Sequence, residues 1–293
     1  MKWLKKTLKI TAFVLLTLIF FVGGYYVKAH FAIEERRTQK YAVEVENLEI
    51  EIDSALLAEG ERLTAIKGCK DCHDSDLGGK VFTDDPLMGT LAARNLTKGK
   101  GGLPADFGTS DWVRALKHGL DRDSSSLLIM PSHKFAKLTE GDMKALIAYC
   151  SQLPKVDRSF PEPRIGPLAR VLTDLGEIPL FPAEYIDHKA PLVREIKAEV
   201  SIPYGKYLSA SCTGCHQENL KGGKALAPGQ PVPANISSTG NPGKWSDEQF
   251  IATLRTGKTP EGKILDPNYM PWPMTKNYTD VELRALHLYL RSL

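Results

Sequence analysis

The sequence predicts an all-α protein with two similar tandem domains, joined by a proline-rich strap and preceded by one N-terminal transmembrane helix. Three features of the 293-residue chain predict it: an apolar run near the N-terminus, an internal repeat, and a cluster of prolines between the two copies. The length suits about two domains. The net charge of +3 is too small to indicate nucleic acid or any other strongly charged partner.

The N-terminal segment has the pattern of a membrane anchor. Four lysines stand near its start: Lys2, Lys5, Lys6 and Lys9. The uncharged run over residues 10–27 would span about 27 Å as a helix, close to the roughly 30 Å hydrocarbon core of a bilayer. Because only Lys28 immediately follows the run, the lysines place the N-terminus in the cytoplasm and the rest outside. The alternative is a signal peptide cleaved near residues 27–29, although the run is longer than such segments usually have.

Two stretches of the remaining chain repeat one another at five landmarks. Residues 69–73 (CKDCH) match residues 212–216 (CTGCH), 143 positions later, and LGGK at 77–80 answers LKGGK at 220–224. Three more pairs are 140 positions apart: Asn95-Leu96-Thr97 with Asn235-Ile236-Ser237, Met130-Pro131 with Met270-Pro271, and ALIAY at 145–149 with ALHLY at 285–289. A spacing held across five landmarks indicates a duplicated domain.

Each copy has helical patterns. Residues 56–66 and 204–210 carry apolar side chains at helix-like spacing before the cysteines. Capping-box pairs predict the starts of three later helices: Ser246 with Gln249, Thr139 with Asp142, and Thr279 with Glu282. Gly119 and Gly257 are placed to end two helices as left-handed caps. We find no strand signal of useful length, and the prediction is therefore all-α.

Prolines are concentrated between the two copies. They are Pro154, Pro161, Pro163, Pro167, Pro179, Pro182 and Pro191. This density favours an extended, semi-rigid strap, which a short helix near residues 168–175 interrupts. The predicted organisation is an anchor over residues 1–30, an acidic spacer over 31–54, a first domain over 55–155, the proline-rich linker over 156–199 and a second domain over 200–293.

A C-x-x-C-H motif occurs once in each copy. The residues are Cys69, Cys72 and His73, and Cys212, Cys215 and His216. Covalent haem attachment needs two thiols spaced to meet the two vinyl groups of the porphyrin, followed directly by an imidazole that binds the iron. Zinc sites, local disulfides and thioredoxin-like pairs also use paired cysteines, but none requires a histidine after both pairs. We therefore predict two covalently bound haem c groups, with His73 and His216 as iron ligands.

Met130 and Met270 are the predicted ligands on the opposite side of each iron. They follow the motif histidines by 57 and 54 residues, and each precedes a proline in a loop before the last helix of its copy. Proline restricts the residue before it and cannot donate a hydrogen bond, which helps to hold such a loop. A thioether opposite histidine raises the reduction potential, as in electron-carrying cytochromes. His133 in the first copy and Met274 in the second are the alternatives.

With these motifs in place, each copy resembles a class I cytochrome c domain. The L-x-G-G-K and N-L-T or N-I-S segments, and Trp245-Ser246-Asp247 with Phe250, are similar to segments of the cytochrome subunits of membrane-bound periplasmic dehydrogenases, such as alcohol dehydrogenases. Those subunits often carry three haem domains, whereas this chain has two motifs. The resemblance covers roughly residues 55–155 and 200–293.

Together these features predict an electron-transfer protein with no substrate chemistry of its own. It would be a single-pass protein of the inner membrane, with its haem domains in the periplasm. The expected partners are redox proteins of a respiratory chain: a dehydrogenase or quinol-oxidising donor, and a cytochrome or oxidase acceptor. The alternative is a di-haem enzyme of the peroxidase or thiosulfate-oxidising type, which needs an iron with an open position. Cys150, whose counterpart is Leu290, is expected to be a small buried hydrophobe.

Overall fold

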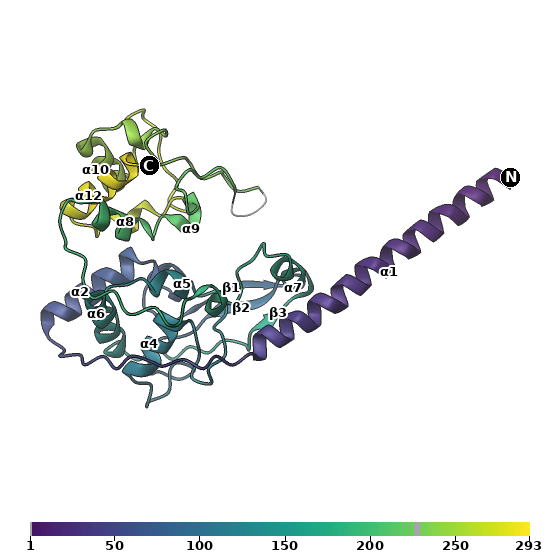
Figure 1. Ribbon diagram of the computed structural model, residues 1–293, viewed down its shortest axis with the longest axis horizontal. Helices are drawn as coiled ribbons and strands as arrows, with labels where there is room; N and C mark the ends of the chain where they lie inside the picture. Colours follow the sequence, from purple (N-terminus) through teal and green to yellow (C-terminus); the bar gives the residue numbers. More distant parts are fainter. Residues whose placement is uncertain (1, 226–228) are drawn as a thin grey trace. The chain divides into compact units, whose positions relative to one another are not determined.

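The computed structural model describes residues 2–225 and 229–293, and it is mostly helical with one small sheet (Figure 1). Met1 of the predicted anchor and residues 226–228 of the predicted second domain lie outside the described residues. The chain divides into two compact units. Unit 1 comprises the chain up to Asn47 with residues 78–136 and 155–190, and unit 2 comprises residues 48–77, 137–154 and 191–293.

The units cut across the predicted first domain, because its N-terminal and C-terminal helices belong to unit 2 and its middle belongs to unit 1. Unit 1 holds α1 (Lys2–Thr38), β1 (Lys80–Asp85), β2 (Gly89–Ala93), α4 (Thr109–His118), α5 (Ser132–Phe135), β3 (Arg164–Ile165), α7 (Pro167–Asp174) and η1 (Pro182–Tyr185). Unit 2 holds α2 (Ser54–Ile66), α3 (Cys69–His73), α6 (Glu140–Ser151), α8 (Ile202–Ser209), α9 (Thr213–His216), η2 (Pro242–Lys244), α10 (Asp247–Thr256), α11 (Trp272–Thr275) and α12 (Asp280–Arg291). Two separate domains therefore stay a prediction from the repeat.

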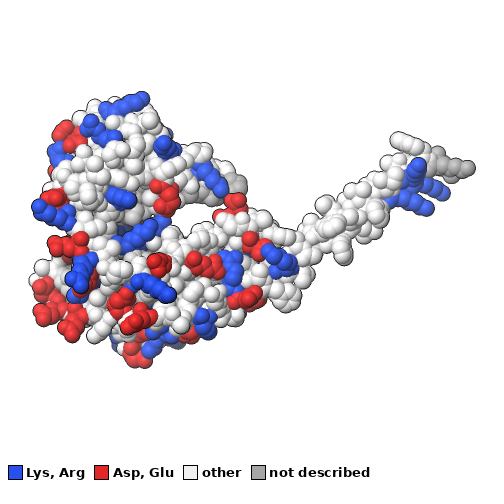
Figure 2. Space-filling model, viewed as in Figure 1, with Lys and Arg blue, Asp and Glu red and all other residues white. Residues whose placement is uncertain are grey.

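The helix α1 is continuous and contains the whole apolar run. Figure 1 shows it extending away from the sheet and α7 of its own unit, and Figure 2 shows an uncharged surface along most of it, with cationic side chains toward its N-terminal end. It is long and apolar enough to cross a membrane, by a test of length and composition that a signal sequence also passes. Residues 31–38 of the predicted spacer continue this helix.

The C-terminal part of α1 packs against α7, the short helix within the proline-rich strap. Ala29 and Ile33 are fully buried there. The Lys28 ammonium lies 2.7 Å from a carboxylate oxygen of Asp174, at the end of α7. The position of α7 confirms the helix predicted near residues 168–175. The end of the apolar run is therefore fixed to a folded part of unit 1.

A three-stranded antiparallel sheet in unit 1 corrects the all-α prediction. The strand order is β1-β2-β3, and β1 and β2 form a hairpin. One carboxylate oxygen of Asp85 accepts hydrogen bonds from the backbone N–H groups of Leu87 and Met88, both at 2.8 Å, and so closes the turn that begins at Pro86. The side chains of β1 are mostly exposed, so this strand lacks the alternating pattern by which a half-buried strand is predicted.

In unit 2, two pairs of helices cross in the same way. α2 packs against α6, and α8 packs against α12. A Cβ atom added to Gly60 of α2 would lie 2.0 Å from the carbonyl oxygen of Ala145, and one added to Gly205 of α8 would lie 2.0 Å from that of Ala285. Ala145 and Ala285 are matched positions of the repeat. The first and last helices of each copy therefore meet at a glycine.

Most of the predicted helix ends are present. Two capping boxes are complete: Ser246 with Gln249, and Thr279 with Glu282. At Thr139 the hydroxyl accepts from the Asp142 N–H at 3.1 Å, but the Asp142 carboxylate instead accepts from the Tyr207 hydroxyl at 2.5 Å. Left-handed caps are found at both predicted glycines, with φ of 64° at Gly119 and 71° at Gly257. In the third predicted capping box, this tertiary contact therefore replaces the expected hydrogen bond from the Thr139 backbone N–H to the Asp142 carboxylate.

Candidate haem-attachment sites

Both C-x-x-C-H motifs form a single helical turn just after the first helix of their copy. Two residues separate α3 from α2, and three residues separate α9 from α8, the last of them Cys212, which caps α9. None of the five cysteines forms a disulfide in the structure. Cys150 is buried in α6, as expected, and burial raises the pKa of its thiol well above the usual range. Each motif therefore brings its two cysteines and its histidine together within one turn of chain, as covalent haem attachment needs.

The backbone around the two motifs has the same unusual conformation. The residue after each motif histidine has a positive φ, 68° at Asp74 and 66° at Gln217. Four positions after the histidines the same holds, with φ of 56° at Leu77 and 58° at Leu220. Positive φ is uncommon outside glycine. Because four non-glycine residues adopt it at matched positions, the two motifs share one local fold.

The imidazole of His216 is oriented by a backbone carbonyl. Its Nδ1 lies 2.7 Å from the carbonyl oxygen of Ala234, and since a carbonyl only accepts, Nδ1 carries the proton. Nε2 is then the nitrogen that can bind a metal, and a second partner of this kind commonly orients a metal-bound histidine. Burial lowers the pKa of His216, which favours the neutral imidazole that ligates metals. The sequence does not reveal the role of Ala234, because its contact is made by a backbone carbonyl, which every residue type has.

The predicted ligands are distributed differently in the two copies. Cys212, Cys215, His216 and Met270 all belong to unit 2. In the first copy Cys69, Cys72 and His73 belong to unit 2, whereas Met130 belongs to unit 1. Unit 2 therefore contains the complete predicted set for one haem.

The two Met-Pro loops have matching geometry. Pro131 and Pro271 have φ of −78° and −74°, with ψ of 50° and 57°. The carbonyl of Met130 accepts from the N–H two residues later at 2.8 Å, and the carbonyl of Met270 does the same at 2.6 Å. Both methionines are half-buried. The alternatives lie in the short helices that follow, His133 in α5 and Met274 in α11.

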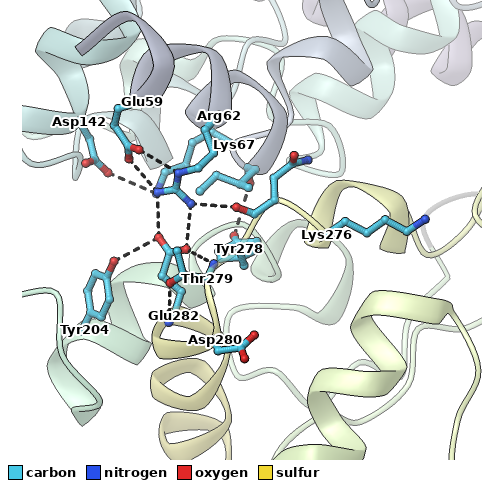
Figure 3. Close-up of polar contacts among 12 residues, drawn as sticks. Glu59, Arg62, Lys67, Asp142, Tyr204, Lys276, Tyr278, Thr279, Asp280 and Glu282 are labelled. Carbon is cyan, nitrogen blue, oxygen red and sulfur yellow. Dashed lines mark hydrogen bonds and ion pairs between the residues drawn. The ribbon is translucent and has the colours of Figure 1, made fainter. Parts of the chain in front are cut away.

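A dense polar network lies near the first attachment segment, within unit 2 (Figure 3). Arg62 of α2 binds Glu282 of α12 at 2.8 Å and Glu59 at 2.9 Å, and the hydrogen bond to Glu59 contributes most to the raised pKa of the guanidinium. Burial lowers the pKa of Lys67, although Asp142 lies 3.9 Å away. These side chains line a cavity of about 400 Å³. The sequence gives no signal for this network, since it joins residues more than two hundred positions apart.

The donor groups suit a haem better than a bare metal ion. Across residues 2–225 and 229–293, no group of three or more histidine, cysteine, aspartate or glutamate side chains is placed to hold a metal ion. Each motif instead combines two cysteines with one histidine, and the orientation of His216 leaves Nε2 as the nitrogen that would bind the iron of a haem. This arrangement differs from a closed structural zinc site, which needs four such ligands.

A comparison with protein families matches residues 203–293 to cytochrome c. This part of the chain belongs to the cytochrome c family. The matched region contains the second motif, the second Met-Pro loop and the last helix. Haem c is therefore implied for this cytochrome by its family and by its paired cysteines.

Curated relatives extend the similarity over most of the chain. The cytochrome is 25% identical over 257 residues to the fructose dehydrogenase cytochrome subunit of Gluconobacter japonicus, covering 81% of this chain and 52% of the relative. It is 25% identical over 270 residues to the cytochrome c subunit of the quinone alcohol dehydrogenase of Gluconobacter oxydans, covering 82% and 55%. A shorter match, 30% over 130 residues and 40% of each chain, links it to subunit CcoP of the cbb3-type cytochrome c oxidase of Helicobacter pylori. The chain spans about half the length of the dehydrogenase subunits.

Proposed function

We propose that this cytochrome carries two haem c groups and transfers electrons in a respiratory chain. A bound haem supplies an iron that gains and loses one electron at a time. Cys69 and Cys72 would attach the first haem, and Cys212 and Cys215 the second. The observation that carries the proposal is the repeated backbone conformation around both motifs, together with the family match to the second copy.

The proposed axial ligands are a histidine and a methionine on each iron. His73 would pair with Met130, and His216 with Met270. The hydrogen bond to Ala234 supports the role of His216, because it fixes the ring with Nε2 available. The matching Met-Pro loops support the two methionines. With both axial positions filled by protein groups, the cytochrome would have no open iron site for a substrate.

We further propose that α1 holds the cytochrome in the inner membrane, with both haem sites in the periplasm. The lysines before the apolar run favour this orientation. The contacts of α1 with α7 support retention of the helix, since Tyr25 and Lys28 both bind Asp174. Electrons would come from a dehydrogenase or a quinol-oxidising donor and leave to a cytochrome or oxidase. The dehydrogenase is favoured as donor because relatives that match more than four-fifths of this chain are cytochrome subunits of dehydrogenases.

The haem content and the methionine ligands can be tested by substitution. Protein matured in a host that attaches haem c should contain two haems per chain. Met130→Leu and Met270→Leu preserve side-chain volume but remove the sulfur, so each should lower one midpoint potential and weaken the red-end sulfur–iron band of the oxidised spectrum. Met88→Leu is the matched control, and Met274→Leu tests the alternative ligand. A spectrum unchanged by Met270→Leu but altered by Met274→Leu would reassign that ligand.

Carbon monoxide distinguishes the electron carrier from a di-haem enzyme. A peroxidase or thiosulfate-oxidising cytochrome needs one iron with a vacant or weakly held position. The reduced wild-type protein should therefore bind carbon monoxide poorly, and the two methionine variants should bind it readily. Rapid binding by the wild-type protein would contradict the carrier function and favour the enzyme.

A further inference from the structure

The last carbonyl of α2 is hydrogen-bonded by two side chains of the second copy. The carbonyl oxygen of Ile66 accepts from the Ser211 hydroxyl at 3.1 Å and from the Tyr278 hydroxyl at 3.4 Å. Carbonyls in the last turn of a helix have no partner within the helix. Ile66 and Tyr278 are buried, so the two hydroxyls provide the partners that water cannot.

This contact joins the two haem-attachment segments directly. Ile66 precedes Cys69 by three residues, and Ser211 directly precedes Cys212. Burial raises the pKa of Tyr278 well above its usual range, with a further contribution from Cys212. The Tyr278 hydroxyl therefore keeps its proton at neutral pH and can act as a donor. A single backbone carbonyl thus links the chain next to one motif with the chain next to the other.

The polar network holds this contact in place. Arg62, one turn before Ile66 on α2, donates to the carbonyl of Asn277 at 3.0 Å and to the carboxylate of Glu282 at 2.8 Å. Asn277 directly precedes Tyr278. Figure 3 shows Arg62 facing Glu282 of α12, with the turn that carries Tyr278 beside it. Arg62 therefore binds a residue that precedes Tyr278 and another that follows it, and these two contacts fix the turn against α2.

The cytochrome fold itself does not need hydroxyl groups at these two positions. The counterpart of Ser211 in the first copy is Gly68, and the counterpart of Tyr278 is Leu138. Leu138 is as well buried as Tyr278, so an apolar side chain fills this place in the other copy. The two hydroxyls are therefore specific to the contact between the copies.

We propose that Ser211 and Tyr278 provide the bonded contact through which an electron passes directly between the two haem sites of one chain. This inference rests on the proposed function, because it requires two haems. One electron leaves the donor site and one arrives at the acceptor site, while Ser211 and Tyr278 change neither oxidation nor protonation state. Electrons tunnel more readily through hydrogen-bonded and packed atoms than across a gap. Both residues are positioning residues, since neither touches a reacting atom in the structure.

The test is the rate of electron exchange within the chain. Tyr278→Phe and Ser211→Ala, singly and together, remove the hydroxyls but keep most of the packing. Tyr204→Phe is the matched control, because it removes a buried hydroxyl that binds Glu282 at 3.2 Å in the same unit. One electron per chain is injected photochemically into fully oxidised protein, and freeze-quenched samples are followed by the electron paramagnetic resonance of the two ferric sites. Midpoint potentials and haem content are measured on the same samples.

The double variant should exchange electrons several-fold more slowly than the wild type, in a phase that is independent of protein concentration. Tyr204→Phe should exchange at the wild-type rate, and the midpoint potentials should not change. A double variant with two haems and wild-type exchange would overturn the contact but leave the proposed function standing. A slower phase that a measured change in potential fully explains would also overturn it. One haem per chain would overturn both proposals.

Discussion

Gly60 of α2 lies directly against the backbone of Ala145 in α6, where a Cβ atom would come within 2.0 Å of the Ala145 carbonyl oxygen. The same relationship recurs between Gly205 and Ala285. Only glycine permits so close an approach of two helix backbones. The crossing therefore depends on the absence of a side chain at each position.

Gly60→Ala should destabilise the protein. The added methyl group forces the two helices apart, and overpacking of this kind costs about 1–3 kcal/mol in the free energy of unfolding. Thermal unfolding measures the effect. Gly141→Ala, on the exposed side of α6, is the matched control, because nothing lies within 4 Å of its added Cβ. Equal unfolding temperatures for the two variants would contradict the close approach.

Glu282→Gln should weaken unit 2 at neutral pH. Burial alone would raise the pKa of Glu282, but its hydrogen bonds with Arg62 and Thr279 hold it below the usual value. The stabilisation is therefore complete above the ordinary carboxyl pKa and is lost as the pH falls below it. We expect the free energy of unfolding to fall by about 2–4 kcal/mol at neutral pH. The substitution removes the ionic partner Glu282 from the half-buried Arg62 charge and leaves its pairing with Glu59.

Unfolding in urea across a range of pH checks this prediction. The difference between wild type and Glu282→Gln should shrink as the solution becomes acidic. Glu199→Gln, which removes an exposed partner of Lys197, should cost less than about 1 kcal/mol. A constant difference at all pH values would show that Glu282 does not act through its charge.

His118 should make the stability of unit 1 sensitive to mild acid. Its ring is fully buried, stacks on His188 and lies 3.3 Å from Glu46. Burial lowers the pKa of His118 to about 4, and the nearby charges of Lys117 and Arg114 act in the same direction. The unfolded chain binds a proton below about pH 6.5, whereas the folded chain does so only near pH 4.

The free energy of unfolding should therefore fall between pH 6.5 and about 4, by on the order of 3 kcal/mol from this group. In His118→Gln this part of the pH dependence should be absent, although the variant is less stable at neutral pH. Urea unfolding at several pH values measures both effects. Parallel curves for the wild type and the variant would exclude His118 as the source.

The mature protein should retain α1. Cleavage near residues 27–29 would remove Tyr25 and Lys28, which bind Asp174 at 2.6 and 2.7 Å. The intact mass of protein extracted from membranes should therefore include the segment before Tyr25. A mature chain beginning near His30 would instead show that the apolar run is a signal peptide.

Local sequence patterns were sufficient to predict where many of the helices begin or end. The reciprocal pair Thr279 and Glu282 and the left-handed cap at Gly257 depend on neighbouring residues only, and both are present. The C-x-x-C-H motifs could be recognised for the same reason, because the two cysteines and the histidine of each lie within five residues. Extending the repeat would not have found the role of Gly60, because Gly205 lies 145 positions later, whereas the motifs that follow these helices are 143 positions apart.

Contacts between distant residues could not be predicted in this way. Asp142 has the position of a capping residue, but the Tyr207 hydroxyl, 65 positions away, takes its carboxylate. The strand β1 is stabilised by pairing with β2 and by the Asp85 turn, and its exposed side chains show no strand pattern. The network around Arg62 likewise depends on a partner 220 positions along the chain.

With α1 held in the membrane as we propose, its unbroken passage from the apolar run to the packing against α7 would make the attachment a stiff stalk and not a hinge. A flexible tether would let unit 1 tumble and offer every side to a passing protein. A stiff stalk limits unit 1 to a narrow range of tilt and height above the bilayer. Partners that diffuse in the same membrane would then meet one preset side, and their recognition surfaces would have to lie at a matching height.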